Sequence, residues 1–326
     1  MIKGCTLTNA SYQGFDSLIL NNEHIKLVIV PELGGKIASL IHTPTQREWL
    51  WRNPHLPQQK PAYDASYIEK FDTGGLDECF PAVSGGPYPD FPWDGVSIPD
   101  HGELWCQPWH AEILECSSSK IVLSMACHGV RLPYRFERLL KMTADSPTIT
   151  LDYTITNLSG FDMPFIWSIH PLINIEEGMR LSLPTDIDTV RLEGTINSTL
   201  GKNGSEIAWP HPELSNVPAS DFGRAYKIFT APLDAFNSDK QVETAIHDPS
   251  GTHALTFRFS PDQISHIAIW MNYGAWSGIG SAPYFNLGLE PCIGSKDGLT
   301  DAKAIDEYGL VQAKQHSRWS LELIIT

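Results

Sequence analysis

Alternation of hydrophobic and polar positions, with a period of two, dominates this chain of 326 residues. Successive side chains of a β-strand point to opposite faces, so such alternation predicts strands with one buried face. The pattern predicts strands over residues 25–30, 37–41, 121–127, 134–140, 148–156, 165–170, 180–183, 255–259, 266–272 and 319–325. Helical periodicity is nearly absent, and the best helical candidate is a short turn at 301–308.

Two stretches lack this alternation. Residues 52–100 are rich in Pro and Gly, with Tyr, Phe and Trp between them, and predict a long ordered loop region with short strands. Ordered loops of this length are usually functional. Residues 195–225 are polar and loop-like. Many short strands without intervening helices predict an all-β fold, a large antiparallel β-sandwich in which residues 1–326 form a single domain.

Charge and cysteine usage narrow the possible partners and the compartment. The net charge of −15 argues against nucleic acid and against anionic membranes. No apolar run approaches the roughly 20 residues of a membrane span, and the N-terminus lacks the apolar core of a signal peptide. The 6 cysteines are scattered without a C-x-x-C pair, which favours reduced thiols and a cytoplasmic protein.

The segment 284–291, Tyr-Phe-Asn-Leu-Gly-Leu-Glu-Pro, is the most informative strand candidate. One face is apolar, and the other carries a phenol, an amide, the gap at Gly288 and the carboxylate of Glu290. A glycine at 288 leaves room for a ligand to approach the backbone. Pro291 has no N–H to donate, so we expect the strand to end there. Glu290 is therefore the candidate catalytic base.

The segment 165–171, Phe-Ile-Trp-Ser-Ile-His-Pro, has the same design. Its apolar positions share one face, His170 lies on the other, and Pro171 is expected to end the strand. Imidazole and carboxylate have ordinary pKa values of about 6.5 and 4.3, which suit a general acid and a general base at neutral pH. His101, in Asp100-His-Gly-Glu-Leu-Trp105, is a second candidate histidine, with an exposed turn as the alternative interpretation.

Other residues are candidate contacts to a ligand. Trp270 and Asn272 share the non-core face of their predicted strand, where an indole can stack on a sugar ring or fill the core of a second sheet. Trp105 follows His101 closely, and Arg131 can contact a substrate or pair with a surface acid. The 12 histidines include no H-x-H or H-E-x-x-H pattern, so no metal is predicted. No P-loop, dinucleotide fingerprint or G-x-S-x-G is present, so no cofactor is predicted.

The chain contains five motifs, in this order: Pro31-Glu-Leu-Gly-Gly-Lys36, Asp100-His-Gly-Glu103, Leu132-Pro-Tyr134, Trp167-Ser-Ile-His-Pro171 and Leu287-Gly-Leu-Glu-Pro291. In these motifs and their order the chain resembles the aldose 1-epimerase (galactose mutarotase-like) family. The resemblance implies a large antiparallel supersandwich, no cofactor and interconversion of the α and β anomers of a free sugar. It implies that Glu290 is the base, His170 the acid that protonates the ring oxygen, and His101 a supporting histidine.

The chain also departs from this family. It lacks the Gly-Arg-x-x-Asn-Arg stretch whose first Arg contacts sugar hydroxyls, and residues 71–81 stand in its place. It also lacks the Tyr-Asp-His-Asn segment that supplies a sugar-binding Asp. Asp77 and Glu78 are therefore candidate sugar contacts, with turn capping as the alternative.

These features predict an isomerase acting on a small-molecule carbohydrate, as a monomer or homodimer. Two alternatives stay open. One is a non-catalytic carbohydrate-binding protein, because a fold does not imply an activity. The other is a glycosidase-like hydrolase, which needs two carboxylates flanking the glycosidic bond. Glu290 with Asp77 or Glu78 would be its carboxylates.

Overall fold

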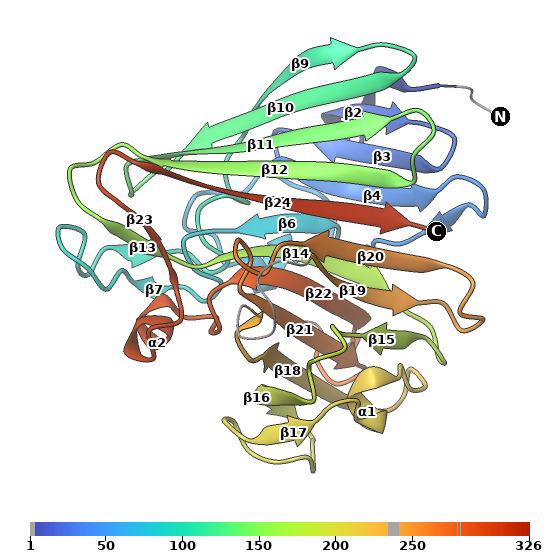
Figure 1. Ribbon diagram of the computed structural model, residues 1–326, viewed down its shortest axis with the longest axis vertical. Helices are drawn as coiled ribbons and strands as arrows, with labels where there is room; N and C mark the ends of the chain where they lie inside the picture. Colours follow the sequence, from blue (N-terminus) through green and yellow to red (C-terminus); the bar gives the residue numbers. More distant parts are fainter. Residues whose placement is uncertain (1–3, 234–240, 279, 281) are drawn as a thin grey trace.

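The computed structural model describes residues 4–233, 241–278, 280 and 282–326, and two large antiparallel sheets make up most of them (Figure 1). Within these residues the larger sheet has 12 strands. In spatial order they are β1 (Thr6–Tyr12), β2 (Phe15–Asn21), β3 (Ile25–Val30), β4 (Lys36–His42), β6 (Leu76–Cys79), β14 (Trp167–Asn174), β22 (Phe285–Ile293), β21 (His266–Tyr273), β18 (Arg224–Thr230), β16 (Thr189–Ile196) and β17 (Glu206–Ala208), with β5 (Arg47–Glu48) paired to β4.

The second sheet has eight strands in the described part of the chain. Their order is β15 (Arg180–Ser182), β19 (Val242–His247), β20 (Ala254–Phe259), β24 (His316–Ile325), β12 (Thr148–Asn157), β11 (Tyr134–Thr143), β10 (Lys120–His128) and β9 (His110–Cys116). Two small pairs complete the strands: β13 (Met163–Phe165) with β23 (Gly309–Val311), and β7 (Gly86–Pro87) with β8 (Ser97–Ile98). The predicted all-β antiparallel sandwich is confirmed.

Alternation explains how the two sheets pack. In β11 and β12 every second residue is buried, and the register places Phe136 opposite Ile155 and Leu140 opposite Leu151. These apolar faces join side chains of the larger sheet, such as Leu40, in one continuous buried cluster. Burial of apolar surface of this kind is the main favourable term in folding. The core therefore lies between the sheets.

Within the residues that the structure describes, helical structure occurs only in short segments. The main ones are a π-helical turn at Tyr67–Phe71, α1 (Pro212–Ser215) and α2 (Leu299–Ala304). The expected turn at 301–308 is thus shifted toward the N-terminus. The polar stretch 195–225, expected to be loop, contains β17 and α1. Among the described residues, no helix is long and apolar enough to cross a membrane.

Candidate active site

His170 and Glu290 lie on neighbouring strands in the middle of the larger sheet. The expectation that Pro171 and Pro291 end these strands is wrong, because β14 and β22 both continue beyond their prolines. The β14–β22 pairing is instead interrupted between the pairs Ser168–Cys292 and Leu172–Gly288. A proline removes one donor from the ladder, and the interruption contains both prolines. The His170 and Glu290 side chains meet at this break.

The carboxylate of Glu290 contacts two basic groups. Its Oε1 lies 3.2 Å from Nδ1 of His170, and its Oε2 accepts a hydrogen bond of 2.7 Å from Nζ of Lys227. The contact to His170 lacks hydrogen-bond geometry, and neither of its two atoms has another hydrogen-bond partner among the described residues. Glu290 is 0% exposed. Burial alone would raise the pKa of Glu290. The larger opposite effects of Lys227 and then His170 lower this pKa to about 2, so the group is ionised at neutral pH.

Lys227 is held between two carboxylates. Its Nζ also lies 3.5 Å from Oδ1 of Asp297. Burial lowers the pKa of Lys227, but Asp297 and Glu290 raise it above its ordinary value, so this buried amine carries a charge. The cation keeps Glu290 ionised in a place that water does not reach.

Gly288 leaves the space that the Glu290 carboxylate occupies. The prediction was that a ligand approaches the backbone at this glycine. In the structure a Cβ at 288 would lie 2.5 Å from Oε1 of Glu290 and 3.4 Å from Cβ of Trp270. The glycine therefore makes room for the base itself, two residues along the same face of the strand.

His101 approaches His170 from a tight turn in the long loop region. Its φ is 63°, and Gly102 follows with φ 74° at a position where a Cβ would lie 2.1 Å from the carbonyl oxygen of Phe80. Only glycine fits such a position without strain. The two imidazole centroids are 5.1 Å apart. Nδ1 of His101 lies 3.0 Å from Oδ2 of Asp100, and although burial lowers the pKa of His101, this carboxylate raises it above its ordinary value.

Asp77 supports His101 indirectly. Its Oδ2 accepts hydrogen bonds of 2.6 Å from Lys36 and 2.9 Å from the Tyr67 hydroxyl, and Asp77 is 2% exposed. The Tyr67 ring stacks on His101 with 3.9 Å between centroids. Asp77 was a candidate sugar contact, but the structure places it outside the lining of the cavity described below, with its Oδ2 engaged by these partners.

Glu78 is equally remote from the cavity. It is 0% exposed in the core between the sheets, where Arg138, Tyr153 and Trp167 all donate to its carboxylate. The structure therefore gives it no access to a sugar. Side chains on adjacent residues of a strand point to opposite faces, and here Glu78 points into the sandwich.

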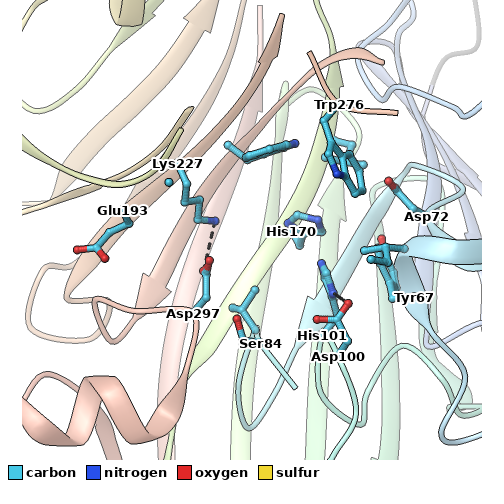
Figure 2. A pocket seen from close by; sticks show the side chains of 15 residues that line it. Tyr67, Asp72, Ser84, Asp100, His101, His170, Glu193, Lys227, Trp276 and Asp297 are labelled. Carbon is cyan, nitrogen blue, oxygen red and sulfur yellow. Dashed lines mark hydrogen bonds and ion pairs between the residues drawn. The ribbon is translucent and has the colours of Figure 1, made fainter. Parts of the chain in front are cut away.

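A cavity of about 340 Å³ opens over His170 and His101 (Figure 2). This is within the roughly 300–1,000 Å³ typical of small-molecule sites. Figure 2 shows Tyr67, Asp72 and His101 on one side of His170, and Lys227, Glu193 and Asp297 on the other. Glu290 lies beneath this floor, behind His170 and Lys227. Within the described residues, no group of three or more His, Cys, Asp or Glu side chains is arranged to hold a metal ion.

The aromatic wall of the cavity comes from Trp270 and Trp276. Both line it, with their rings edge to face and 6.1 Å between centroids. Trp270 therefore lies where a stacking contact requires it. Asn272 does not: it is 0% exposed, its Oδ1 accepts from the backbone N–H of Trp276 at 3.1 Å, and its amide donates to the Trp276 carbonyl. Asn272, a candidate sugar contact, thus lies outside the cavity lining and braces the backbone of Trp276.

Trp105 and Arg131 also lie outside the cavity lining. Trp105 is 4% exposed, packs edge-on against Tyr67 and donates its indole N–H to the Asp100 carbonyl. Arg131 donates to the Ser97 carbonyl at 2.8 Å and covers the ring of Tyr63. The first supports the His101 turn, and the second fixes a surface loop, so neither is placed to bind a sugar.

Several residues of the site were not predicted, among them Lys227, Asp72 and Trp276. Lys227 lies on β18 in the run Arg-Ala-Tyr-Lys-Ile-Phe-Thr, where a lysine among alternating apolar residues was a usable signal of a buried charge. Asp72 and Trp276 come from loops, and their approach to His170 depends on contacts between distant segments that no local pattern records.

Sequence and structure comparisons agree with this architecture. The model of the aldose 1-epimerase family matches residues 16–263. This match covers about three quarters of the chain, and together with the fold it shows that the chain belongs to the aldose 1-epimerase family. Among curated proteins, none matches the sequence significantly.

Solved structures with the same fold share little sequence with the chain. A galactose mutarotase-like protein from Clostridium acetobutylicum has a TM-score of 0.69 and 13% identity, with 99% of each chain covered. A galactose mutarotase related enzyme from Lactobacillus acidophilus has a TM-score of 0.65 and 14% identity, covering 95% of this chain and 97% of that one. The Slr1438 protein from Synechocystis has a TM-score of 0.67 and 14% identity, with coverages of 98% and 99%. At these identities the likeness shows the fold alone.

Proposed function

We propose that this protein is a mutarotase that interconverts the α and β anomers of a free aldose by acid/base ring opening. The observation that carries the proposal is the contact between His170 Nδ1 and Glu290 Oε1, 3.2 Å apart below a sugar-sized cavity. A proton acceptor and a proton donor thus lie side by side at the cavity floor, with His170 lining the cavity and Glu290 directly behind it. Family membership supports the same reaction class.

In the proposed mechanism Glu290 removes the proton of the C1 hydroxyl while protonated His170 donates to the ring oxygen. The C1–O5 bond breaks, a carbonyl forms at C1, and rotation about C1–C2 presents its other face. Ring closure then returns both protons with the roles reversed. His101, with its raised pKa and its partner Asp100, holds the ring oxygen. Proton transfers of this kind each contribute typically 10² to 10⁴-fold.

The contacts of Glu290 impose a condition on this mechanism. Its carboxylate is fully covered by His170 and Lys227, so a sugar hydroxyl must replace one of these two contacts. Losing a neighbouring cation raises the proton affinity of a carboxylate. Substrate entry would therefore convert a weak base with a pKa of about 2 into a stronger one.

Of the alternatives, the hydrolase is less well supported, because neither residue named for its second carboxylate lines the cavity. Asp77 and Glu78, the candidates for that role, are both buried in ion pairs outside the cavity. A binding protein without catalysis keeps the cavity and its tryptophans, but it does not need an imidazole against a buried carboxylate.

Anomer exchange of freshly dissolved sugars, followed by polarimetry or by NMR exchange, tests the proposal. We expect Glu290→Gln to lower kcat/KM by 10²-fold or more, because an amide cannot accept the proton. Glu176→Gln is the matched control, since this half-exposed carboxylate pairs with Arg47 outside the cavity. A folded Glu290→Gln variant with full activity would exclude Glu290 as the base. Wild-type protein that binds sugar without accelerating exchange would favour the binding protein.

A further inference from the structure

Asp72 presents an unsatisfied carboxyl group to the cavity. It lies just after the π-helical turn, is 5% exposed and lines the cavity beside Tyr67 (Figure 2). Its Oδ1 is buried without a hydrogen-bond partner, and no described residue donates a hydrogen bond to either of its carboxyl oxygens. Buried polar atoms are nearly always paired. An unpaired acceptor that faces a cavity is therefore suited to a donor that arrives with the ligand.

The other carboxylates around the cavity differ from Asp72 because each has a basic partner. Asp100 lies 3.0 Å from His101, Asp297 lies 3.5 Å from Lys227, and Glu193 accepts from Lys296 at 2.6 Å. The charged or basic neighbours of Asp72 are the two imidazoles in the cavity and, outside its lining, Lys36, which is itself paired with Asp77. Burial raises its pKa above the ordinary value, although His170 and His101 act to lower it.

Positive charge available to a ligand is scarce in the same cavity. Among its described lining residues there is no arginine, and the single lysine, Lys227, is already shared by Glu290 and Asp297. Phosphate and carboxylate groups are usually bound by arginine forks or free lysines. The two imidazoles of the lining also face carboxylates, His101 that of Asp100 and His170 that of Glu290. The lining thus offers acceptors and aromatic faces, and each of its basic groups is already paired with a carboxylate.

We propose that Asp72 is a substrate-binding residue that accepts hydrogen bonds from the hydroxyl groups of an uncharged sugar, and that it makes the cavity reject sugars carrying phosphate or carboxylate groups. This inference rests on the proposed function only in taking a sugar as the ligand. A hydroxyl donor satisfies Asp72, whereas an anionic group brings a second negative charge close to a carboxylate that is only 5% exposed.

Equilibrium binding distinguishes this role. D-glucose, D-galactose and D-mannose are titrated into the protein by calorimetry, each beside its 6-phosphate, so that every pair differs only by the anionic group. We expect the wild type to bind at least one neutral sugar and to bind it at least tenfold more tightly than its phosphate. In Asp72→Asn, which keeps the shape and removes the charge, we expect affinity for that sugar to fall roughly tenfold, as for the loss of one charged hydrogen bond. Discrimination against the phosphate should fall as well.

Asp16→Asn is the matched control, because Asp16 is an exposed carboxylate on β2, four strands away from β14 in the sheet order, and its variant should bind like the wild type. Equal or tighter binding of the 6-phosphates by the wild type overturns the proposal, and this comparison does not depend on any variant. An Asp72→Asn variant with unchanged affinity and selectivity would also overturn the proposal, and so would a wild type that binds none of the neutral sugars. Binding with the expected selectivity but without anomer exchange would support the role of Asp72 and contradict the proposed mutarotase activity.

Discussion

The Glu290 carboxylate shows how one residue can couple the chemistry of a site to the stability of the fold. It is fully buried and keeps its charge because Lys227 and His170 touch its two oxygens. A base held by such partners is oriented before any ligand arrives, and orientation of catalytic groups is a large part of enzymatic rate enhancement. The same contacts make it a weak base in the free protein, so ligand binding has to release it.

This carboxylate should make the fold sensitive to acid. Its pKa is about 2 in the folded protein against 4.5 for the ordinary group, so its ionisation stabilises the fold above pH 4.5, and that contribution is lost as the pH falls toward 2. A difference of this size corresponds to roughly 3 kcal/mol. We expect the free energy of unfolding, measured with urea from pH 7 to pH 3, to fall more steeply in the wild type than in Glu290→Gln.

The Glu290→Gln variant should also be less stable at pH 7, because Lys227 keeps only the more distant Asp297. Glu176→Gln, with its exposed ion pair, should follow the wild-type curve at all pH values. Parallel curves for the wild type and Glu290→Gln would mean that Glu290 has no lowered pKa in the folded protein.

At the scale of the strand, β22 carries both the base and the space in which the base lies. Gly288 pairs with Trp270 on β21 and leaves open the volume above its Cα that Oε1 of Glu290 occupies. Adding one methyl group at Gly288 should therefore displace the Glu290 carboxylate without substituting any residue of the proposed chemistry.

We expect Gly288→Ala to lower kcat/KM for anomer exchange by at least tenfold, because its Cβ would lie 2.5 Å from Oε1 of Glu290. Thermal unfolding should show a folded protein with reduced Tm. The control is Gly160→Ala, at an exposed position where an added Cβ meets no atom within 4 Å. Unchanged activity of Gly288→Ala would show that Glu290 does not need its observed position.

Strand patterns predicted the scaffold better than the site. Residues 25–30 form β3 as predicted, and the predicted strand 148–156 lacks only the last residue of β12, because alternation over a half-buried strand is a local signal. The position of β6 within the long loop region was not predicted. This strand has only four residues, and all of them are buried, including Asp77 and Glu78. Its charges are neutralised by Lys36 and Arg138 from distant segments, and no local pattern shows such pairing.

The prediction that Pro171 and Pro291 end their strands was wrong for a related reason, since it too depended on partners from distant segments. A proline removes one N–H from a ladder, which a strand held on both sides can tolerate. β14 retains β6 as a partner at Pro171, and β22 retains β21 at Pro291. The sequence predicted that His170 and Glu290 share a site, but it placed them at the rim of a sheet. The floor of the cavity is instead in the sheet's interior, with loops and β18 supplying the walls.

At the scale of the whole molecule, a buried polar network joins the two sheets beneath this floor. Glu78 on β6 accepts from Arg138 on β11 at 3.0 Å, from Tyr153 on β12 at 2.8 Å and from Trp167 on β14 at 2.9 Å. Arg138 and Glu78 are both 0% exposed. Since β6 and β14 hold Asp77 and His170, the network fixes the larger sheet against the smaller one where the site is built.

Breaking this ion pair from one side should be costly, because it leaves an uncompensated charge in the core. We expect Arg138→Met to lower the free energy of unfolding by about 3–5 kcal/mol. The double variant Arg138→Met/Glu78→Gln should recover part of that loss, because the remaining amide can still accept from Tyr153 and Trp167.

Urea unfolding of the wild type, both single variants and the double variant gives the coupling energy as a double-mutant cycle. Exposed Arg258→Met, whose partners are Glu243 and Glu322, provides the scale for a surface pair and should cost less than about 1 kcal/mol. Additive effects at 138 and 78 would show that the two sheets are held by apolar packing alone.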